Sequence, residues 1–562
     1  MATEAETTQT QRRIHDTNLK RTSTTCVWFN PETGIYSSKQ KPIHLPTYPY
    51  LDVVSLIFSH KHNGVSALID SSSGFTIPYS KLPHIVKSMA SGLHEIGISQ
   101  GDVVSILLPN TIYFPIIYLC ILSIGAIFTA INPLSSLPEI QKQLNQCRTS
   151  IVFTTVDKVK EIKKMGVDVI AVPETVDSPS NSSEFSCFHK LLSSNPNSAP
   201  KPIIKQEDTA AILFSSGTSG PSKGVVMTHR NLIAAVELFV RFEAFQYNYP
   251  ASENVYLAAL PLFHVYGLSL LATGVLSLGT TVVVMRKFSE QEMVKAMDEY
   301  RVTHVPVVPP ILMSLVRLKK SGHEFPSLKQ VSSGAAPAGK ALIEEFLRNF
   351  PSVDFIQGYG MTETTAVGTR GFNTDTIKYT SIGLLAPNME AKVVNPISGS
   401  SMPPGESGEL WLRGPSIMKG YLNNEEATKD AIDKDGWLHT GDVTYFDQDG
   451  YIYVLDRLKE IIKYKGFQIA PADLESVLIS HPDIADAAIT AAPDEIAGEI
   501  PVAFVVKRPG SSLSEADVIT FVAGKVAPYK KVRKVIFTTS IPKSPAGKIL
   551  RRKLKETLMS RM

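Results

Sequence analysis

The stretch Ser215-Ser216-Gly217-Thr218-Ser219-Gly220-Pro221-Ser222-Lys223-Gly224 follows a short apolar run, 210–214, which is typical of a buried strand. Glycines let the backbone turn and approach an anion, and successive N–H groups form an anion-binding nest. The hydroxyls add donors and Lys223 adds positive charge. Ser/Gly clusters are also typical of plain surface loops, but the preceding strand and the lysine favour a phosphate-binding loop. The Walker pattern does not fit this stretch.

The composition narrows the class of protein. A chain of 562 residues exceeds what one core usually sustains, so we expect at least two domains. A hydrophobic fraction of 43% and a charged fraction of 19% are ordinary for a globular protein. The net charge of +3 is small for this length and does not indicate nucleic-acid binding. The four cysteines lack metal or disulfide spacing, which favours a reducing compartment.

Helical and strand patterns alternate along most of the chain, which predicts an α/β protein with βαβ units around mainly parallel sheets. The predicted helices are 80–96, 290–300 and 338–350. The predicted strands are 103–108, 151–155, 167–172, 281–285, 304–308 and 354–356. The polar, threonine-rich residues 1–22 are predicted to be disordered, and the Ser/Pro/Asn-rich residues 175–201 to form an exposed loop.

The apolar segment 113–131 is long enough for a membrane span. Pro115 and Gly125 interrupt it, and no Lys or Arg flanks it. We therefore predict a buried core helix that leads into a strand, and no transmembrane span.

Beyond Tyr445 the composition changes to short strands and turns, and the charged segment 456–460 follows. We place a domain boundary there, because the remaining residues are enough for an independent small domain. The predicted domains are therefore 23–458 and 459–562.

Further motifs stand in a fixed order with the glycine-rich loop. They are Pro261-Leu262-Phe263-His264-Val265-Tyr266, Gly334-Ala335-Ala336-Pro337, Gln357-Gly358-Tyr359-Gly360-Met361-Thr362-Glu363, Gly408-Glu409-Leu410-Trp411-Leu412-Arg413-Gly414, His439-Thr440-Gly441-Asp442, Asp456-Arg457-Leu458-Lys459-Glu460, Lys463-Tyr464-Lys465-Gly466-Phe467-Gln468 and Pro545-Ala546-Gly547-Lys548. From about Asn30 onward the chain resembles the adenylate-forming superfamily, most closely its plant 4-coumarate:CoA ligase-like members. The resemblance implies a large α/β N-terminal domain and a small α+β C-terminal domain that rotates on a hinge.

The resemblance also implies an acid–thiol ligase. ATP would convert a carboxylic acid to an acyl-adenylate with loss of pyrophosphate, and the thiol of coenzyme A would then displace AMP. Bringing a carboxylate against a triphosphate requires fixed positive charge and Mg²⁺. Lys548 matches the family's catalytic lysine, which can reach both the α-phosphate and the acid. The neighbouring basic residues, Lys530, Lys531, Arg533, Lys534, Arg551 and Arg552, are expected to be mostly solvated charges.

The same resemblance assigns the nucleotide site. Asp442 would accept hydrogen bonds from the ribose hydroxyls, with Arg457 as a second ribose or phosphate contact. Glu363 would be the Mg²⁺ ligand, since oxygen suits that cation, and Thr362 would contact the α-phosphate. The remaining predicted nucleotide contacts are Ser215, Ser216, Gly217, Thr218, Ser219, Lys223, Ala335, Gln357 and Gly358.

The acid site follows from the histidine motif. A lone histidine in an apolar stretch is usually a core residue, but the motif implies that His264 orients the carboxylate or gates the site. The other predicted pocket residues are Tyr266, Ser332, Gly334, Gly360 and Val367. Ser332 stands where the hydroxycinnamate enzymes place a lysine, and Leu270 replaces a small polar residue. A pocket without that polar partner loses preference for a phenol, so we expect an apolar acid: a fatty acid, a jasmonate precursor, or benzoate or cinnamate.

The second half-reaction is assigned to the small domain. Lys459 matches the hinge about which this domain rotates between half-reactions. Catalytic Lys463, with Lys465, Gly466 and Gln468, would then face the CoA thiol arm, and Lys287 matches a CoA nucleotide contact. Without the motif, Lys463 and Lys465 would be interpreted as ordinary surface lysines.

Ser560-Arg561-Met562 has the small–basic–apolar form of a peroxisomal address, so we expect recognition by the peroxisomal import receptor, with the cytoplasm as the alternative. Three other functions stay open: a true 4-coumarate ligase, an adenylating enzyme that does not use CoA, and a non-catalytic nucleotide-binding scaffold. The presence of both Lys548 and Asp442 argues against the scaffold.

Overall fold

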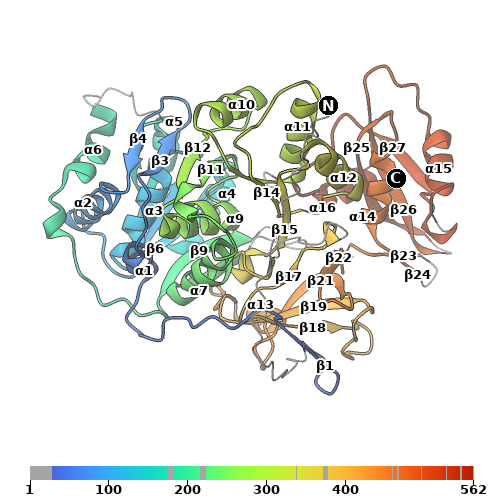
Figure 1. Ribbon diagram of the computed structural model, residues 1–562, viewed down its shortest axis with the longest axis horizontal. Coiled ribbons are helices and arrows are strands. Elements are labelled where there is room, and N and C mark those ends of the chain that lie inside the picture. Colours follow the sequence, from blue (N-terminus) through green and yellow to red (C-terminus); the bar gives the residue numbers. More distant parts are fainter. Residues whose placement is uncertain are drawn as a thin grey trace, which may run out of the picture.

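The computed structural model of the protein describes residues 28–174, 183–215, 223–336, 338–370, 378–458, 460–464, 467–494, 497–526, 528–544 and 547–560. Within this part of the chain the strands form four sheets. The larger part of the molecule holds three of them, and the C-terminal residues, at the right of Figure 1, hold the fourth.

The seven-stranded sheet, of order β20-β10-β9-β6-β5-β7-β8, carries the phosphate-loop segment. Its strands are β5 (Val103–Leu107), β6 (Ile127–Ala130), β7 (Ile151–Thr154), β8 (Asp168–Ala171), β9 (Thr209–Ser215), β10 (Lys223–Thr228) and β20 (Gly420–Tyr421). The pairs from β9 to β8 are parallel, and β10 is antiparallel to β9. Every residue of β5 is buried, as its continuous apolar sequence predicts.

The nine-stranded sheet has the order β17-β16-β15-β14-β13-β11-β12-β3-β4. Its strands are β3 (Ser66–Asp70), β4 (Thr76–Pro78), β11 (Val255–Ala258), β12 (Thr281–Val284), β13 (His304–Val307), β14 (Gln330–Ser333), β15 (Asp354–Tyr359), β16 (Thr369–Arg370) and β17 (Leu384–Leu385). Strands β3 and β11 to β15 pair in parallel. The C-terminal ends of β14 and β15 therefore lie at one edge, where the glycine motifs begin.

The six-stranded sheet is antiparallel and has the order β1-β2-β18-β19-β21-β22. Its strands are β1 (Phe29–Asn30), β2 (Ile35–Ser37), β18 (Glu390–Val394), β19 (Gly408–Arg413), β21 (Leu438–Phe446) and β22 (Ile452–Arg457). In Figure 1 it lies below the other two sheets. Pairing of β21 with β22 places Asp442 opposite Arg457.

The small C-terminal sheet consists of β23 (Ile462–Tyr464), β24 (Phe467–Ile469), β25 (Ile484–Asp494), β26 (Gly498–Lys507) and β27 (Lys534–Phe537). Helices α14 (Pro471–Ile479), α15 (Glu515–Ala523) and α16 (Arg551–Met559) accompany it. Two hydrophobic clusters formed within 462–558 are separate from the main core. One hydrogen bond from β22 reaches α14: Ala472 N donates to Asp456 Oδ2 at 2.9 Å.

Helices surround the sheets of the large domain. They are α1 (Val53–Ser59), α2 (Leu82–Glu95), α3 (Tyr113–Ser123), α4 (Leu137–Cys147), α5 (Val156–Lys164), α6 (Ser186–Ser193), α7 (His229–Ala235), α8 (Phe242–Ala244), α9 (Val265–Gly267), α10 (Glu290–Glu299), α11 (Pro309–Lys320), α12 (Lys340–Asn349) and α13 (Glu425–Ala431). Two π-helices, η3 (Val236–Arg241) and η5 (Leu268–Gly274), pack against each other. The short 3₁₀ turns are η1 (Ser183–Phe185), η2 (Pro196–Ser198), η4 (Ala251–Glu253), η6 (Val275–Leu278), η7 (Thr362–Thr364) and η9 (Pro528–Lys530).

The structure confirms the α/β fold class and most predicted elements, with ends that shift by one to three residues. The apolar segment from Tyr113 forms α3, buried from Tyr113 to Leu122, and continues into β6 as predicted. Among the described residues, no helix has the length and apolarity that crossing a membrane requires.

The predicted exposed loop at 175–201 is wrong at residues 183–193, and its first residues, 175–182, lie outside the described residues. Residues from Ser183 form η1 and α6, because Phe185, Phe188 and Leu191 bury their side chains. The predicted disorder at 1–22 lies outside the described residues.

Candidate active site

A buried carboxylate on the six-stranded sheet marks the first part of the site. Asp442 is 4% exposed, accepts a hydrogen bond from the Tyr359 hydroxyl at 2.6 Å, and lies 3.2 Å from Arg457 Nε. Burial raises the pKa of Asp442, and Arg457 and Tyr359 oppose that rise because both stabilise the anion. The predicted pair Asp442 and Arg457 therefore stands together, held by Tyr359 from the nine-stranded sheet.

Lys548 approaches this carboxylate from the small domain. Its segment is a tight turn in which Ser544 N donates to Lys548 O at 2.7 Å, and Gly547 adopts a φ of +76° that favours glycine. Burial, together with the nearby charge of Arg457, lowers the pKa of the Lys548 amine to about 8. Glu460 and Asp442 oppose this shift, so Lys548 lies within the field of the predicted ribose site.

A small cavity of about 30 Å³ lies beside these groups, lined by Phe239, His264, Val265, Tyr266, Gly334, Ala335, Gly358, Tyr359, Gly360, Ala366 and Thr369. His264 precedes α9, and its Nδ1 accepts a hydrogen bond from Tyr266 N at 3.4 Å. Burial, followed by the charge of Lys548, lowers the pKa of His264 to about 4. The imidazole is therefore neutral at physiological pH.

Glycines form part of the cavity wall because other backbone lies close to them. A Cβ on Gly360 would stand 2.3 Å from the Ala366 carbonyl oxygen, and one on Gly334 would stand 3.1 Å from the Tyr266 ring. The Tyr266 hydroxyl lies 3.4 Å from Ser332 Oγ and donates to the Ser332 carbonyl at 3.3 Å. Ser332 thus lies behind Tyr266 rather than on the wall, and Val367 is buried outside the lining set.

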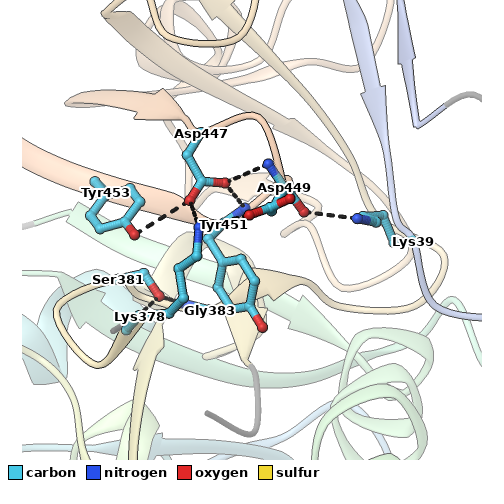
Figure 2. A network of polar contacts seen from close by, with 8 residues as sticks. All are labelled: Lys39, Lys378, Ser381, Gly383, Asp447, Asp449, Tyr451 and Tyr453. Carbon is cyan, nitrogen blue, oxygen red and sulfur yellow. Dashed lines mark hydrogen bonds and ion pairs between the residues drawn. The ribbon is translucent and has the colours of Figure 1, made fainter. Parts of the chain in front are cut away.

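Gln357 is fixed by backbone carbonyls. Its Nε2 donates to Tyr379 O at 2.8 Å and to Ser381 O at 3.3 Å, which ties β15 to the turn that follows Lys378. The same turn is held by a polar network around Asp447 (Figure 2), in which Lys378 Nζ pairs with Asp447 and with Asp449. Gln357 therefore holds in place a backbone segment beside Gly358, the cavity-lining residue.

The predicted phosphate loop connects two antiparallel strands. Ser215 ends β9, Lys223 begins β10, and the two are directly paired. The intervening residues, which include the predicted Ser216, Gly217, Thr218 and Ser219, lie outside the described residues. Lys223 Nζ lies 4.8 Å from the centroid of the Tyr421 ring.

Glu363 lies near β9, the strand that precedes this loop. It is 5% exposed, accepts a hydrogen bond from the Tyr421 hydroxyl at 3.0 Å, and follows Thr362 in η7, which lies against β9. A desolvated carboxylate next to the phosphate-loop strand fits Mg²⁺, which prefers oxygen ligands.

The described residues among those predicted to contact CoA do not line this cavity. Lys463 and Gln468 are paired on the β23–β24 hairpin, at the lower right of the small domain in Figure 1, and nothing is described of their side chains. Lys287 occupies an exposed bend after β12 and does not line the cavity. Lys459, Lys465 and Gly466 lie outside the described residues.

Sequence reasoning missed five cavity residues: Phe239, Val265, Tyr359, Ala366 and Thr369. Tyr359 belongs to a motif already quoted, and its position between two glycines was an available signal. Arg551 was expected to be solvated, but its side chain is 11% exposed and paired with two glutamates. That expectation is wrong because its partners are distant in sequence.

A lysine from a small C-terminal domain, placed against a buried carboxylate and a glycine-walled cavity of a large α/β domain, defines the adenylate-forming class of enzymes. The chain belongs to the AMP-binding enzyme family. The model described as AMP-binding enzyme matches residues 58–422, and that of the AMP-binding enzyme C-terminal domain matches residues 473–548.

Named relatives and solved structures agree with this membership. The chain is 59% identical to 4-coumarate--CoA ligase-like 6 of Arabidopsis thaliana over 94% of each chain. It is 44% identical to Peroxisomal OPC-8:0-CoA ligase 1 of Arabidopsis thaliana, over 94% of this chain and 96% of that one. ATP-bound MatB from Rhodopseudomonas palustris superposes with a TM-score of 0.81 at 26% identity, covering 90% of this chain and 98% of MatB. MenE from Bacillus subtilis with its acyl-adenylate intermediate gives 0.76 at 28% identity, with coverages of 90% and 98%.

Proposed function

We propose that this enzyme is an acid–CoA ligase that forms an acyl-adenylate and pyrophosphate from a carboxylic acid and ATP, then transfers the acyl group to the thiol of CoA with release of AMP. The observation that carries the proposal is the placement of Lys548 beside Asp442 and Arg457, next to the cavity that contains His264. The relatives named as CoA ligases support the thiol acceptor.

In the first half-reaction, Asp442 binds the ribose hydroxyls and the Lys548 ammonium lies between the α-phosphate and the acid carboxylate. Its charge offsets the repulsion between the two anions as the carboxylate oxygen attacks phosphorus and pyrophosphate leaves. Neutral His264 can donate or accept a hydrogen bond and so orient the carboxylate without adding charge.

Glu363 would hold Mg²⁺, which when bound offsets the charge of the phosphates. A neighbour, MenE from Bacillus subtilis, was solved with ATP and magnesium ion. Lys223 and the hydroxyl-rich residues of the phosphate loop would bind the β- and γ-phosphates.

For thioester formation, the small domain would rotate about Lys459 and turn the β23–β24 hairpin, with Lys463, Lys465, Gly466 and Gln468, toward the cavity. Lys287 would contact the CoA nucleotide. The mutual charge effects of Lys548 and Asp442 support assigning the described arrangement of the two domains to the adenylation step.

The acid is proposed to be apolar. Among the described residues that line the cavity there is no Asp, Glu, Lys or Arg, and the Tyr266 hydroxyl already donates to the Ser332 carbonyl. The hydroxyls of Tyr359 and Thr369 also donate hydrogen bonds within the protein, to Asp442 and to the Ile382 carbonyl. These engaged hydroxyls favour a fatty acid, a cyclopentanone-bearing fatty acid or cinnamate over a phenolic acid.

A screen for CoA-dependent AMP release tests the function. The acids are octanoate, cinnamate, benzoate, 4-coumarate and OPC-8:0, and Lys548→Ala is the control with strongly reduced activity. We expect AMP release with at least one apolar acid that exceeds the rate with 4-coumarate. The absence of AMP release with every acid, or equal release without CoA, would contradict the proposal.

We also propose a peroxisomal location, supported by Ser560-Arg561-Met562 and by the relative named as peroxisomal. Ser560 is exposed at the end of α16, and the two residues after it lie outside the described residues. Deleting 560–562 from a fluorescently tagged chain should leave the protein in the cytosol, and unchanged organelle targeting would refute the address.

A further inference from the structure

A buried cluster of charges joins the start of α16 to the rest of the small domain. Arg551 Nη1 lies 2.8 Å from Glu460 Oε2, and its Nη2 lies 2.7 and 2.8 Å from the two carboxylate oxygens of Glu475. Its Nε donates to the Ile489 carbonyl at 3.1 Å. Each guanidinium nitrogen therefore has a partner, and the partners come from three separate segments of the chain.

The geometry of this cluster is tightly constrained. The side chains of Arg551 and Glu460 are each 11% exposed, and that of Glu475 is 13% exposed. Glu475 Oε1 also accepts the Ile489 N–H at 2.8 Å, so Arg551 and Glu475 bind both backbone polar groups of one residue in β25. A planar guanidinium with two fixed carboxylates can adopt few orientations.

A gain in folding stability does not by itself explain why the protein contains this cluster. A buried ion pair loses much of its Coulomb energy to desolvation, and apolar residues of similar volume often stabilise a fold equally well. Apolar packing does not fix the orientation of a side chain in this way, whereas the cluster holds the charged side chain in one orientation.

Arg551 stands at the end of the turn that carries Lys548. Lys548 N donates to Ser544 Oγ at 3.2 Å, and Leu550 N donates to Pro542 O at 2.8 Å, which closes the turn immediately before Arg551. Lys543 and Ile549 form a bridge within it. The position of the Lys548 backbone therefore depends on where α16 begins, and Arg551 fixes that start.

We propose that Arg551, oriented by Glu460 and Glu475, is a positioning residue that places Lys548 for adenylate formation. The inference rests on the role given to Lys548 in the proposed function. Glu460 contributes twice, since it binds Arg551 directly and its charge acts on the Lys548 amine.

The first test measures ATP–pyrophosphate exchange with octanoate and with cinnamate. In Arg551→Lys and Glu475→Gln we expect kcat to fall about 100-fold, as for a misplacement of about 1 Å, while KM for ATP changes by less than about threefold. The adjacent Arg552 is the matched control, because its side chain is 71% exposed and pairs only with Glu556 one turn away. Arg552→Ala should keep the wild-type rate within about twofold.

A second measurement separates positioning from general loss of structure. Thermal melting confirms that each variant is folded at the assay temperature, and Arg551→Lys, which keeps the charge, is used in place of Arg551→Ala. In a Lys548→Ala background, Arg551→Lys should reduce the residual exchange rate no further, because both changes remove one interaction. A full additional 100-fold loss in that background would overturn the positioning role.

A third readout does not need the acid. Acetic anhydride labels Lys548, and mass spectrometry follows that labelling with and without MgATP. ATP should slow the labelling of Lys548 in the wild type and in Arg552→Ala, but not in Arg551→Lys. If the wild type is active with none of the five acids of the screen, the proposed function fails, while this labelling still decides the position of Lys548. Equal protection by ATP in Arg551→Lys, or an unchanged exchange rate, would overturn the inference.

Discussion

The lowered pKa of Lys548 predicts an alkaline limit to adenylation. Burial and Arg457 lower the pKa of this amine to about 8, so its folded-state pKa lies below the ordinary lysine value of about 10.4. Only the cation can offset the charge of two anions. As pH rises through about 8, kcat/KM for ATP should therefore fall, reaching about one tenth of its plateau one unit above the pKa.

Pyrophosphate exchange measured from pH 7 to pH 10.5 at fixed ionic strength checks this limit, because kcat/KM reports groups of the free enzyme. Two titratable groups of the same site do not titrate in this range: burial lowers the pKa of His264 to about 4, and burial raises the pKa of Tyr359 well above its ordinary value. Lys548→Arg keeps the charge and should move the alkaline limb above pH 10 at a reduced rate. A wild-type plateau that extends to pH 10, or an unshifted limb in Lys548→Arg, would refute the reasoning.

Three further predictions concern other contacts of the site. Asp442→Asn leaves Arg457 without its anionic partner. KM for ATP in pyrophosphate exchange should rise about 10- to 100-fold, which is the effect expected for the loss of one hydrogen bond to a charged group. An unchanged KM would show that Asp442 does not belong to the nucleotide site. Phe239→Ala should enlarge the 30 Å³ cavity and raise the ratio of kcat/KM for dodecanoate over butyrate, and the exposed Phe245→Ala, its control, should not. Asp456→Ala removes the acceptor for Ala472 N at the start of α14, a loss of about 1 kcal/mol that is similar to the loss of a helix cap. Single-turnover adenylation should therefore slow about fivefold, while thioester formation from preformed adenylate is retained. Equal slowing of both steps would argue against a role of Asp456 in domain orientation.

Three of the residues proposed from short contiguous motifs are ones that the structure brings close together. Lys548, Asp442 and His264 each stand in a motif with a fixed pattern, and all three lie around one region of the structure. The sheets were predictable for a similar reason, since continuous apolar runs such as that of β5 produce strands buried on both faces.

The remaining features depend on contacts between distant segments. Arg551 belongs to a basic stretch that is typical of solvated surface, and its anchors Glu460 and Glu475 are 91 and 76 residues away in sequence. Phe239 lies in an apolar run with no motif, and only the π-helix η3 shows that its ring reaches the cavity. Helix α6 escaped prediction because the loop-like residues before it set the average composition of the segment.

The glycine walls of the cavity have a consequence for how this family diversifies. Gly360 meets backbone that cannot move aside, so drift at that position is blocked whatever the acid. Phe239, Val265, Ala366 and Thr369 line the same space, whereas the described partners of Asp442 are Tyr359 and Arg457. If the cavity holds the acid as proposed, changes at these few positions alter the acid preference, while the residues proposed for adenylation stay the same in duplicated genes.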